Sequence, residues 1–262
     1  MIFLTGAITE YIDVAQVALY IFWLFFAALI YYLHRENKRE GYPLVSEHGK
    51  PGRIEGFPAM PKPKTFILPH GMGTVTAPRQ EVDTSAINAR ATAAFSGAPL
   101  DPTGDPMMSG VGPGAYAARA NRADVTHEGH ARIVPLRVAG DFAIHSDDPD
   151  PRGMPVIAGD GKAAGTVRDV WVDRSESLIR YYEVGVGGAG PAEKRVLLPV
   201  NFANVSRARK EVAVKAIYAK HFASVPATAS PDQVTRLEEE RIMAYYGSGL
   251  LYADPKRAES LI

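Results

Sequence analysis

The sequence predicts a single N-terminal transmembrane α-helix, a mainly β cytoplasmic domain built as a small antiparallel barrel, and a C-terminal helix. Three observations lead to this fold class: an apolar run at residues 14–33, a series of short strand-like segments within residues 131–225, and a capped helical pattern within residues 226–262. The chain has 262 residues, of which 46% are hydrophobic and 22% charged, and this is ordinary for a protein with a sizeable core.

The run from Val14 to Leu33 is long enough to cross a bilayer. Only Gln16 in it is strongly polar, and at about 1.5 Å per residue a helix of this length spans roughly 30 Å of hydrocarbon. The alternatives are a buried soluble helix and a secretory signal peptide. A buried helix is rarely apolar around its whole circumference, and a signal peptide begins with basic residues. Residues 1–13 contain no Lys or Arg, so we expect a retained single span.

The charges that flank the run predict its orientation. Residues 1–33 contain no Lys or Arg, whereas Arg35, Lys38 and Arg39 follow at once. Because basic residues are retained on the cytoplasmic side, residues 1–13 should lie outside and the rest of the chain in the cytoplasm. The same three cations either bind anionic lipid headgroups or only set the topology. Glu36 and Glu40 dilute the positive patch, and both interpretations stay open.

Residues 34–130 are predicted to form an interaction arm. Much of the chain's 24 Gly and 20 Pro lies here, and proline prevents long regular elements. The segment is too apolar for a disordered linker, because large hydrophobic side chains recur through it and require a surface to pack on. These side chains are Phe57, Phe66, Ile67, Leu68, Val75, Phe95, Met107 and Met108. We therefore expect the arm to lie across another protein.

Residues 131–225 carry the pattern of short β-strands. Runs rich in Val, Ile and Tyr alternate with turn residues such as Asp160-Gly161 and Gly187-Gly188, as in small barrels or sandwiches. The predicted strands occupy residues 132–144, 154–158, 164–173, 177–186, 194–206 and 211–219. Apolar residues on both sides of Trp171 mix the alternation, which suggests that a partner covers part of the outer surface.

A helix is predicted over residues 231–246, within a C-terminal segment at 226–262. Ser230 is the N-cap candidate, Pro231 suits the first helical position, and Gly247 suits a left-handed C-terminal residue. Val234, Leu237, Ile242 and Tyr245 form its apolar side.

Composition and motifs argue against several classes of function. The 29 basic and 29 acidic residues cancel, so no overall field attracts nucleic acid. The chain has no cysteine, which excludes thiolate metal sites and cysteine nucleophiles. Residues 185–190 match G-x-G-x-x-G, but Pro191 and a strand follow where a dinucleotide fold needs a helix, so a glycine-rich hairpin is expected. No nucleophile with its base is present, and we predict that the chain is not an enzyme.

Two charged clusters remain open on the residues alone. His127-Glu128-Gly129-His130 is either an ordinary surface turn or a metal or proton site. The stretch VDRSESLIRYYEV, residues 172–184, places Asp173, Glu176 and Arg180 in an otherwise strand-like run. It is either a solvated turn or a site that handles charge.

Several long motifs occur in an order that closely resembles the H subunit of the purple-bacterial photosynthetic reaction centre. They are REGYPL at 39–44, PKPKTFILPHG at 61–71, PTGDPM at 102–107, WVD at 171–173 and GSGLLYADPKR at 247–257, all behind a single N-terminal span. The resemblance covers essentially the whole chain. It implies a structural subunit whose PRC-type barrel caps the L and M subunits and shields the quinone region from water.

The resemblance also implies the setting of the chain. No cofactor is expected on this chain itself; bacteriochlorophyll, bacteriopheophytin, quinones, non-haem iron and carotenoid are expected in the partner subunits. The partners implied are L and M, the surrounding light-harvesting antenna and membrane lipids, and a cytochrome subunit is compatible with the same complex. The location implied is the bacterial inner, intracytoplasmic membrane, with a periplasmic N-terminus.

Quinone reduction gives the two charged clusters an expected role. Reducing the secondary quinone consumes two protons, which must cross protein that excludes water. By resemblance, Asp173, Glu176 and Arg180 lie beside this path, and clustered or buried carboxylates have raised pKa values that suit a relay. His130 matches one histidine of the family's surface pair, while Glu128 stands in place of the other. Proton collection is therefore expected there, and a metal site is not.

A second function is compatible with the residues. The chain would then be a membrane-anchored adaptor whose barrel docks an unrelated soluble partner.

Overall fold

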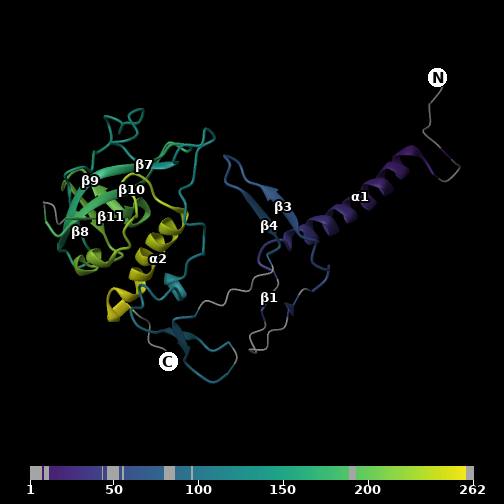
Figure 1. Cartoon of the computed structure of the whole chain (residues 1–262), viewed down its shortest axis with the longest axis horizontal. Coiled ribbons are helices and arrows are strands. Elements are labelled where there is room, and N and C mark those ends of the chain that lie inside the picture. Colours follow the sequence, from purple (N-terminus) through teal and green to yellow (C-terminus); the bar gives the residue numbers. More distant parts are fainter. Residues whose placement is uncertain are drawn as a thin grey trace. The chain divides into compact units, whose positions relative to one another are not determined.

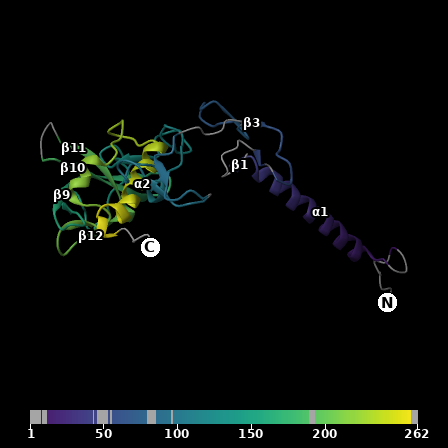
Figure 2. The same cartoon turned by 90° about the horizontal axis from the view of Figure 1, so that it is seen from below.

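The computed structural model describes residues 8, 12–42, 44–45, 53–54, 56–79, 86–95, 97–188 and 193–257 (Figures 1 and 2). Contacts divide the chain into two compact units, Met1–Ser85 and Ala86–Ile262. The sequence-based boundary between arm and barrel at residue 130 therefore falls inside the second unit. Of the predicted outer segment 1–13, only residues 8, 12 and 13 are described.

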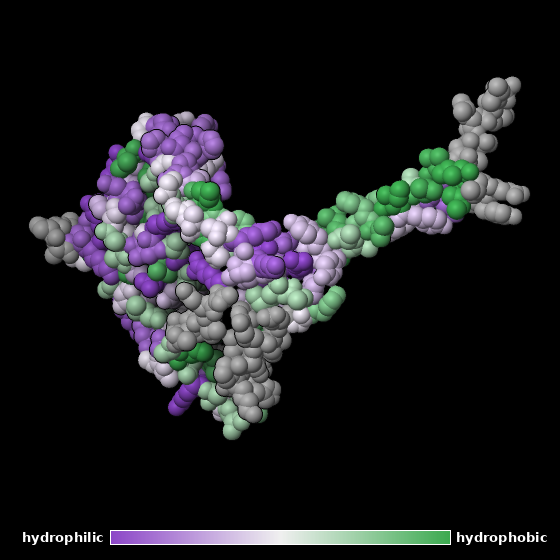
Figure 3. All heavy atoms as spheres, turned by 45° about the vertical axis from the view of Figure 1, so that its right-hand side comes forward, coloured by the Kyte–Doolittle hydropathy of each residue, from purple (hydrophilic) through white to green (hydrophobic). Residues whose placement is uncertain are grey.

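Helix α1, Val14–Asn37, contains the predicted span and continues one turn beyond Leu33. Asp13 caps its N-terminus by accepting a hydrogen bond from the Gln16 N–H at 2.7 Å. The helix has no buried residue, and among the described residues it alone is long and apolar enough to cross a membrane. Apolar side chains cover most of the visible surface of the helix at the right of Figure 3.

The rest of the first unit consists of two short antiparallel pairs. Strand β1, Leu44–Val45, pairs with β2, Arg53–Ile54, and strand β3, Lys64–Ile67, pairs with β4, Thr74–Ala77. Short elements are expected in a segment so rich in proline and glycine. Their apolar side chains stay outside any core of the unit: Phe57 is 83% exposed and Ile67 87% exposed.

The second unit begins with one more short pair and continues into the main sheet. Strand β5, Ala89–Ala91, pairs with β6, Leu100–Pro102, and a 3-10 turn, η1, follows at Gly112–Gly114. The main-sheet strands are β7 Ile133–Pro135, β8 Pro155–Ile157, β9 Ala163–Asp173, β10 Leu178–Val186, β11 Lys194–Pro199, β12 Ala203–Ser206 and β13 Glu211–Val214. Within the described residues they have the order β11-β10-β9-β8-β13-β12, and β7 also pairs with β9.

The sheet differs from the prediction in three places. Strands β8 and β13 pair in parallel, so the sheet is not antiparallel throughout. Only Ile133–Pro135 of the strand predicted at 132–144 is extended in the sheet. The strand predicted at 194–206 divides into β11 and β12 around a 3-10 turn, η2, at Val200–Phe202. Because this short turn joins the two strands at the ends of the strand order, it brings the ends together, as in a barrel.

The glycine-rich hairpin is confirmed. Strands β10 and β11 pair antiparallel, and Gly187 and Gly188 have φ values of +89° and +96°, which favour glycine. Residues 189–190 of the motif, and residues 191–192 after it, lie outside the described residues.

The mixed alternation around Trp171 has a structural cause. Trp171 is 1% exposed and packs into the main core with Leu198, Phe222 and Tyr246. The neighbouring Val172 packs instead into a smaller cluster that contains Val134 and Ala139. Strand β9 is therefore buried on both faces at this end, by parts of its own chain.

Helix α2 spans Arg236–Tyr252, so the prediction of 231–246 was wrong at both ends. Thr235 is the N-cap and forms a capping box with Glu238, in which each side chain accepts a hydrogen bond from the other residue's N–H. The helix continues through Gly247 instead of ending there, and close packing requires a small residue two positions further on, at Gly249. A Cβ on Gly249 would lie 2.8 Å from the Ala216 carbonyl oxygen.

Candidate functional site

The turn that follows β9 is built around the carboxylate of Asp173. This side chain is 1% exposed, and its Oδ1 accepts hydrogen bonds from the N–H groups of Ser175 at 2.9 Å and Glu176 at 3.1 Å. Such side-chain contacts replace backbone pairing in tight turns. Ser177, with φ +54°, completes the turn before β10 begins. The backbone of Glu176 is thus hydrogen-bonded to the carboxylate of Asp173, so the two acids predicted from the sequence lie together in one turn.

The arginine that binds these acids is Arg132, which the sequence reasoning missed. Its guanidinium forms ion pairs with Asp173 at 2.9 Å and Asp124 at 3.4 Å, and it also pairs with Glu176. Strand β7 places it there, because Ile133 is the register partner of Asp173 in β9. Arg180, the predicted arginine, is exposed, and in the described part of the chain no ion pair joins it to either acid.

The pKa of Asp173 shifts in the direction opposite to the expectation. Burial alone would raise it, but hydrogen bonds from Arg132 and from the Glu176 and Ser175 N–H groups outweigh burial and hold the pKa below its ordinary value. The carboxylates of Asp173 and Glu176 in turn raise the pKa of Arg132. Asp173 therefore stays ionised at neutral pH and anchors the arginine, while Glu176, with a side chain that is 52% exposed, is the accessible acid.

A cavity of about 730 Å³ adjoins this ion cluster. One side is formed by the β9–β10 turn and Arg132, and the other by residues of α2. Two further ion pairs line the cavity: Arg119 contacts Glu240 at 2.8 Å, and Arg236 contacts Asp124 at 3.3 Å. The cavity is therefore lined by charges of both signs, which suits bound water and mobile protons better than an apolar ligand.

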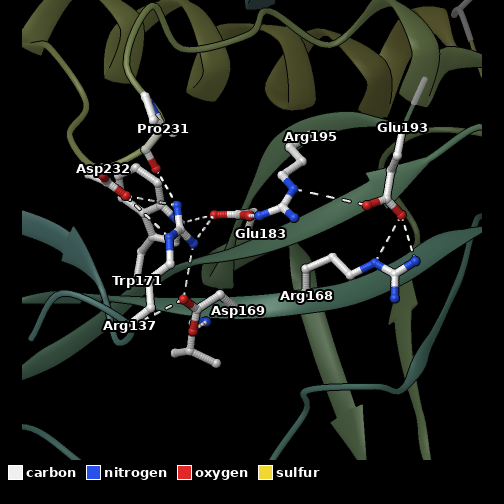
Figure 4. Close-up of polar contacts among 10 residues, drawn as sticks. Arg137, Arg168, Asp169, Trp171, Glu183, Glu193, Arg195, Pro231 and Asp232 are labelled. Carbon is white, nitrogen blue, oxygen red and sulfur yellow. Dashed lines mark hydrogen bonds and ion pairs between the residues drawn. The ribbon is translucent and has the colours of Figure 1, made fainter. Parts of the chain in front are cut away.

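A second charged cluster fixes the segment that leads into α2 (Figure 4). Arg137 donates to Asp169 at 3.0 Å and Glu183 at 2.8 Å, and also to the Pro231 carbonyl. Glu183 is 2% exposed and additionally accepts from the Trp171 indole N–H at 2.9 Å. Because burying an unpaired carboxylate is costly, these contacts keep Arg137 in place and hold the start of the α2 segment against the sheet.

The predicted histidine cluster forms the tip of a short hairpin. Val125 and Ala131 pair as an isolated bridge, and the Thr126 N–H donates to the His130 carbonyl at 2.8 Å. The side chains of His127, Glu128 and His130 are exposed around a cavity of about 620 Å³.

The carboxylate of Glu128 is the acid of this tip. The adjacent Thr126 side chain, a backbone hydrogen bond and the nearby histidines lower the pKa of Glu128, so it is ionised at neutral pH. Among the described residues no three His, Asp or Glu side chains are grouped to hold a metal ion.

The β9–β10 turn lies between the two cavities. Arg174 and Ser175 line the cavity at the histidine tip, whereas Asp173 and Glu176 line the larger one. Arg132 follows the histidine hairpin by two residues, so one continuous segment connects both sites. The two clusters that the sequence left separate are therefore neighbours.

The three cations after the span have different surroundings. Arg35 is exposed on α1. Lys38 is 3% exposed; its Nζ donates to the Pro58 carbonyl at 2.5 Å and lies 5.2 Å from the centre of the Tyr42 ring. Lys38 thus holds the end of α1 to the following segment, and Arg35 is the cation of the three that stands at the surface of this unit.

Arg39 is similarly engaged within the first unit. It contacts Glu36 through two hydrogen bonds of 2.7 and 2.9 Å, and it donates to the carbonyls of Lys62 at 2.8 Å and Ala77 at 3.0 Å. The side chain is 9% exposed. These bonds attach the C-terminal end of α1 to the β3–β4 hairpin.

Two models of known protein families match the chain. The family model described as photosynthetic reaction centre, H-chain N-terminal region, matches residues 6–138, and the model of the PRC-barrel domain matches residues 145–221. The first match covers the span, the short hairpins and the histidine tip, and the second covers most of the main sheet. The two together cover most of the sequence, and the chain belongs to the H-chain family of the photosynthetic reaction centre.

Proposed function

We propose that this chain caps the L and M subunits of the reaction centre on the cytoplasmic side, stabilises the complex, shields the quinone site from water and assists proton uptake to the secondary quinone. The light-absorbing and redox cofactors would reside in the partner subunits, and this chain would carry out no catalysis of its own. Antenna proteins, membrane lipids and a cytochrome subunit would be further neighbours in the same membrane.

The exposed apolar residues of the first unit support the capping role. In the described part of this unit no core forms that could bury Phe57, Phe66, Ile67 or the side chains of α1. A subunit that lies across other hydrophobic chains would bury them. The absence of Lys and Arg from residues 1–33 supports a periplasmic N-terminus.

The position of the β9–β10 turn between two cavities carries the proposal for proton uptake. Protons would be collected by the ionised Glu128 and by His130 at the hairpin tip, and would pass the turn towards the larger cavity. Glu176 is accessible there and is held in place by Arg132. Asp173 would act by fixing Arg132 rather than by carrying the proton, because its pKa lies below the ordinary value. Arg180 would contribute positive charge to the cavity wall.

Replacing Glu176 by glutamine tests the role of the turn. The variant keeps a hydrogen-bond acceptor for Arg132 but cannot bind a proton. We expect a slower proton-coupled second electron transfer to the secondary quinone, and unchanged earlier light-driven steps, in flash absorption measurements on intact reaction centres. Glu211→Gln on β13, outside both cavities, is the control. An unchanged second transfer would remove Glu176 from the path.

Replacing Glu128 and His130 together tests proton collection. We expect slower proton uptake, measured with a pH-indicator dye after a flash, and recovery when weak acids are added as soluble carriers. Proton uptake at the normal rate would show that both residues belong to an ordinary surface turn and do not collect protons.

Gentle extraction of the tagged chain from its native membrane tests the complex itself. Bacteriochlorophyll and two larger hydrophobic chains should accompany it. A colourless preparation with a soluble partner would favour the membrane-anchored adaptor instead.

A further inference from the structure

Helix α2 contributes a further carboxyl group to the larger cavity. Glu239 lies on α2, is only partly exposed and lines the cavity together with Glu176. Its Oε2 accepts a hydrogen bond from the Tyr181 hydroxyl at 3.0 Å. Among the described residues no hydrogen bond is made to its other oxygen, Oε1, and that oxygen can therefore bind a proton or a water molecule in the cavity.

Tyr181 orients this carboxyl group but does not exchange protons itself. The tyrosine is 2% exposed on β10, and burial together with the adjacent Glu239 raises the pKa of its hydroxyl. The hydroxyl therefore keeps its proton at neutral pH and remains a donor. A fixed donor on Oε2 leaves proton binding and release to Oε1.

The charges around Glu239 differ from those around Asp173. Burial raises the pKa of Glu239, Asp124 raises it further, and the Tyr181 hydrogen bond with the positive charges of Arg180 and Arg132 offsets this only in part. Its helix neighbours Arg236 and Glu240 are already paired, with Asp124 and Arg119. Within the part of the chain that the structure describes, no ion pair holds Glu239, whereas Arg132 holds Asp173. Among the acids of the cavity, Asp173 is thus held in its ionised form, whereas Glu239 binds a proton more readily than an ordinary glutamate does.

We infer that Glu239 is a second proton-carrying residue of this chain, which receives a proton through the water of the cavity and releases it towards the quinone. This inference rests on the proposed function of the cavity. In the step, Oε1 of the carboxylate takes a proton from water or from Glu176, and the neutral acid then gives that proton to the next acceptor and returns to a carboxylate. Tyr181 keeps its proton throughout.

The test uses intact reaction centres with Glu239→Gln, which keeps an acceptor for Tyr181 but cannot titrate. The second electron transfer should slow about tenfold, less than the roughly 10²- to 10⁴-fold contribution of a single positioned acid or base, because Glu176 offers a parallel route. The infrared difference spectrum of quinone reduction should lose a protonated-carboxyl band. Glu238→Gln is the matched control, because it removes an adjacent charge on α2 and keeps the capping box.

Tyr181→Phe separates proton transfer from a merely structural role. Loss of the donor should raise the pKa of Glu239 further and move the pH at which the second transfer falls to higher values. A variant that only loosened α2 would slow the transfer equally at all pH values, and that result would overturn the inference.

The outcomes for the two glutamates are distinguishable. A normal rate and an unchanged carboxyl band in Glu239→Gln, with a slow Glu176→Gln, would overturn the role of Glu239 and leave the proposed function standing. A slow Glu239→Gln with a normal Glu176→Gln would support Glu239 and remove Glu176 from the path. Normal rates in both would overturn both proposals.

Discussion

The two units of the chain stabilise themselves in different ways. The second unit buries a continuous core around Trp171, Leu198, Phe222 and Tyr246. The first unit, in its described residues, buries none of its large apolar side chains and uses Lys38 and Arg39 to hold backbone carbonyls together. The difference indicates that the second unit carries its own hydrophobic driving force, whereas the first depends on the membrane and on partner subunits for apolar burial.

Loss of a large side chain from each unit should give the largest contrast. Trp171→Ala should lower the free energy of unfolding by about 3–5 kcal/mol, because it leaves a cavity and removes a donor from the buried Glu183. Ile67→Ala, at a residue that is 87% exposed, should change the stability of the isolated chain by less than about 0.5 kcal/mol. It should nevertheless weaken assembly with the other reaction-centre subunits.

Urea denaturation of the full-length chain in detergent measures the first quantity, and the yield of assembled complex measures the second. Equal losses of stability in the two variants would contradict the difference between the units.

Removing Arg137 should have the next largest effect. Arg137→Met leaves the buried Asp169 without a cation, while Glu183 keeps its ion pair with Arg195. The change should cost about 3 kcal/mol, since breaking one side of a buried pair strands the charge of the other, here that of Asp169. The double variant with Asp169→Asn should recover part of the loss. A recovery of zero in the same urea measurement would show that the packing of Arg137, not its charge, matters.

Arg39 and Arg35 offer a smaller comparison within the first unit. Arg39→Ala removes the bonds to Lys62 and Ala77 and should make the β3–β4 hairpin more sensitive to limited proteolysis in the detergent-solubilised chain. Arg35→Ala should leave that sensitivity unchanged and should lower binding to vesicles of anionic lipid if headgroup contact is its role. Equal proteolysis of the two variants would contradict the anchoring role of Arg39.

The smallest effect concerns pH. The folded pKa of Asp173 is lowered, so its contribution to stability is fully present above the unfolded value of about 3.9 and is lost as the pH falls through the folded pKa. Melting temperatures of the wild type and Asp173→Asn should converge in that acidic range and differ near neutrality. Parallel curves at all pH values would show that Asp173 contributes no charge-dependent stability.

Local patterns predicted most of the fold and part of the candidate site. Hydropathy located α1, and the alternation of apolar residues located most strands of the main sheet. The start of α2 was misplaced because Ser230 and Pro231 form a plausible local cap, while the capping box at Thr235 and Glu238 is the one used. Asp173 and Glu176 were found because they are close in sequence. Arg132 was not, because it meets Asp173 only through the pairing of β7 with β9.

The order of neighbouring residues was enough to predict an apolar helix long enough to span a membrane, the β-rich second unit and the family, because hydropathy, side-chain periodicity and long motifs are local properties. The pairing of each cation with its acid, in contrast, depends on the folded chain. Arg132 rather than Arg180 binds Asp173, Lys38 and Arg39 turn inward to backbone carbonyls, and Glu239 reaches the same cavity from α2. Ion pairs and pKa values depend on distances and burial, and these arise when strands and helices far apart in the sequence come together.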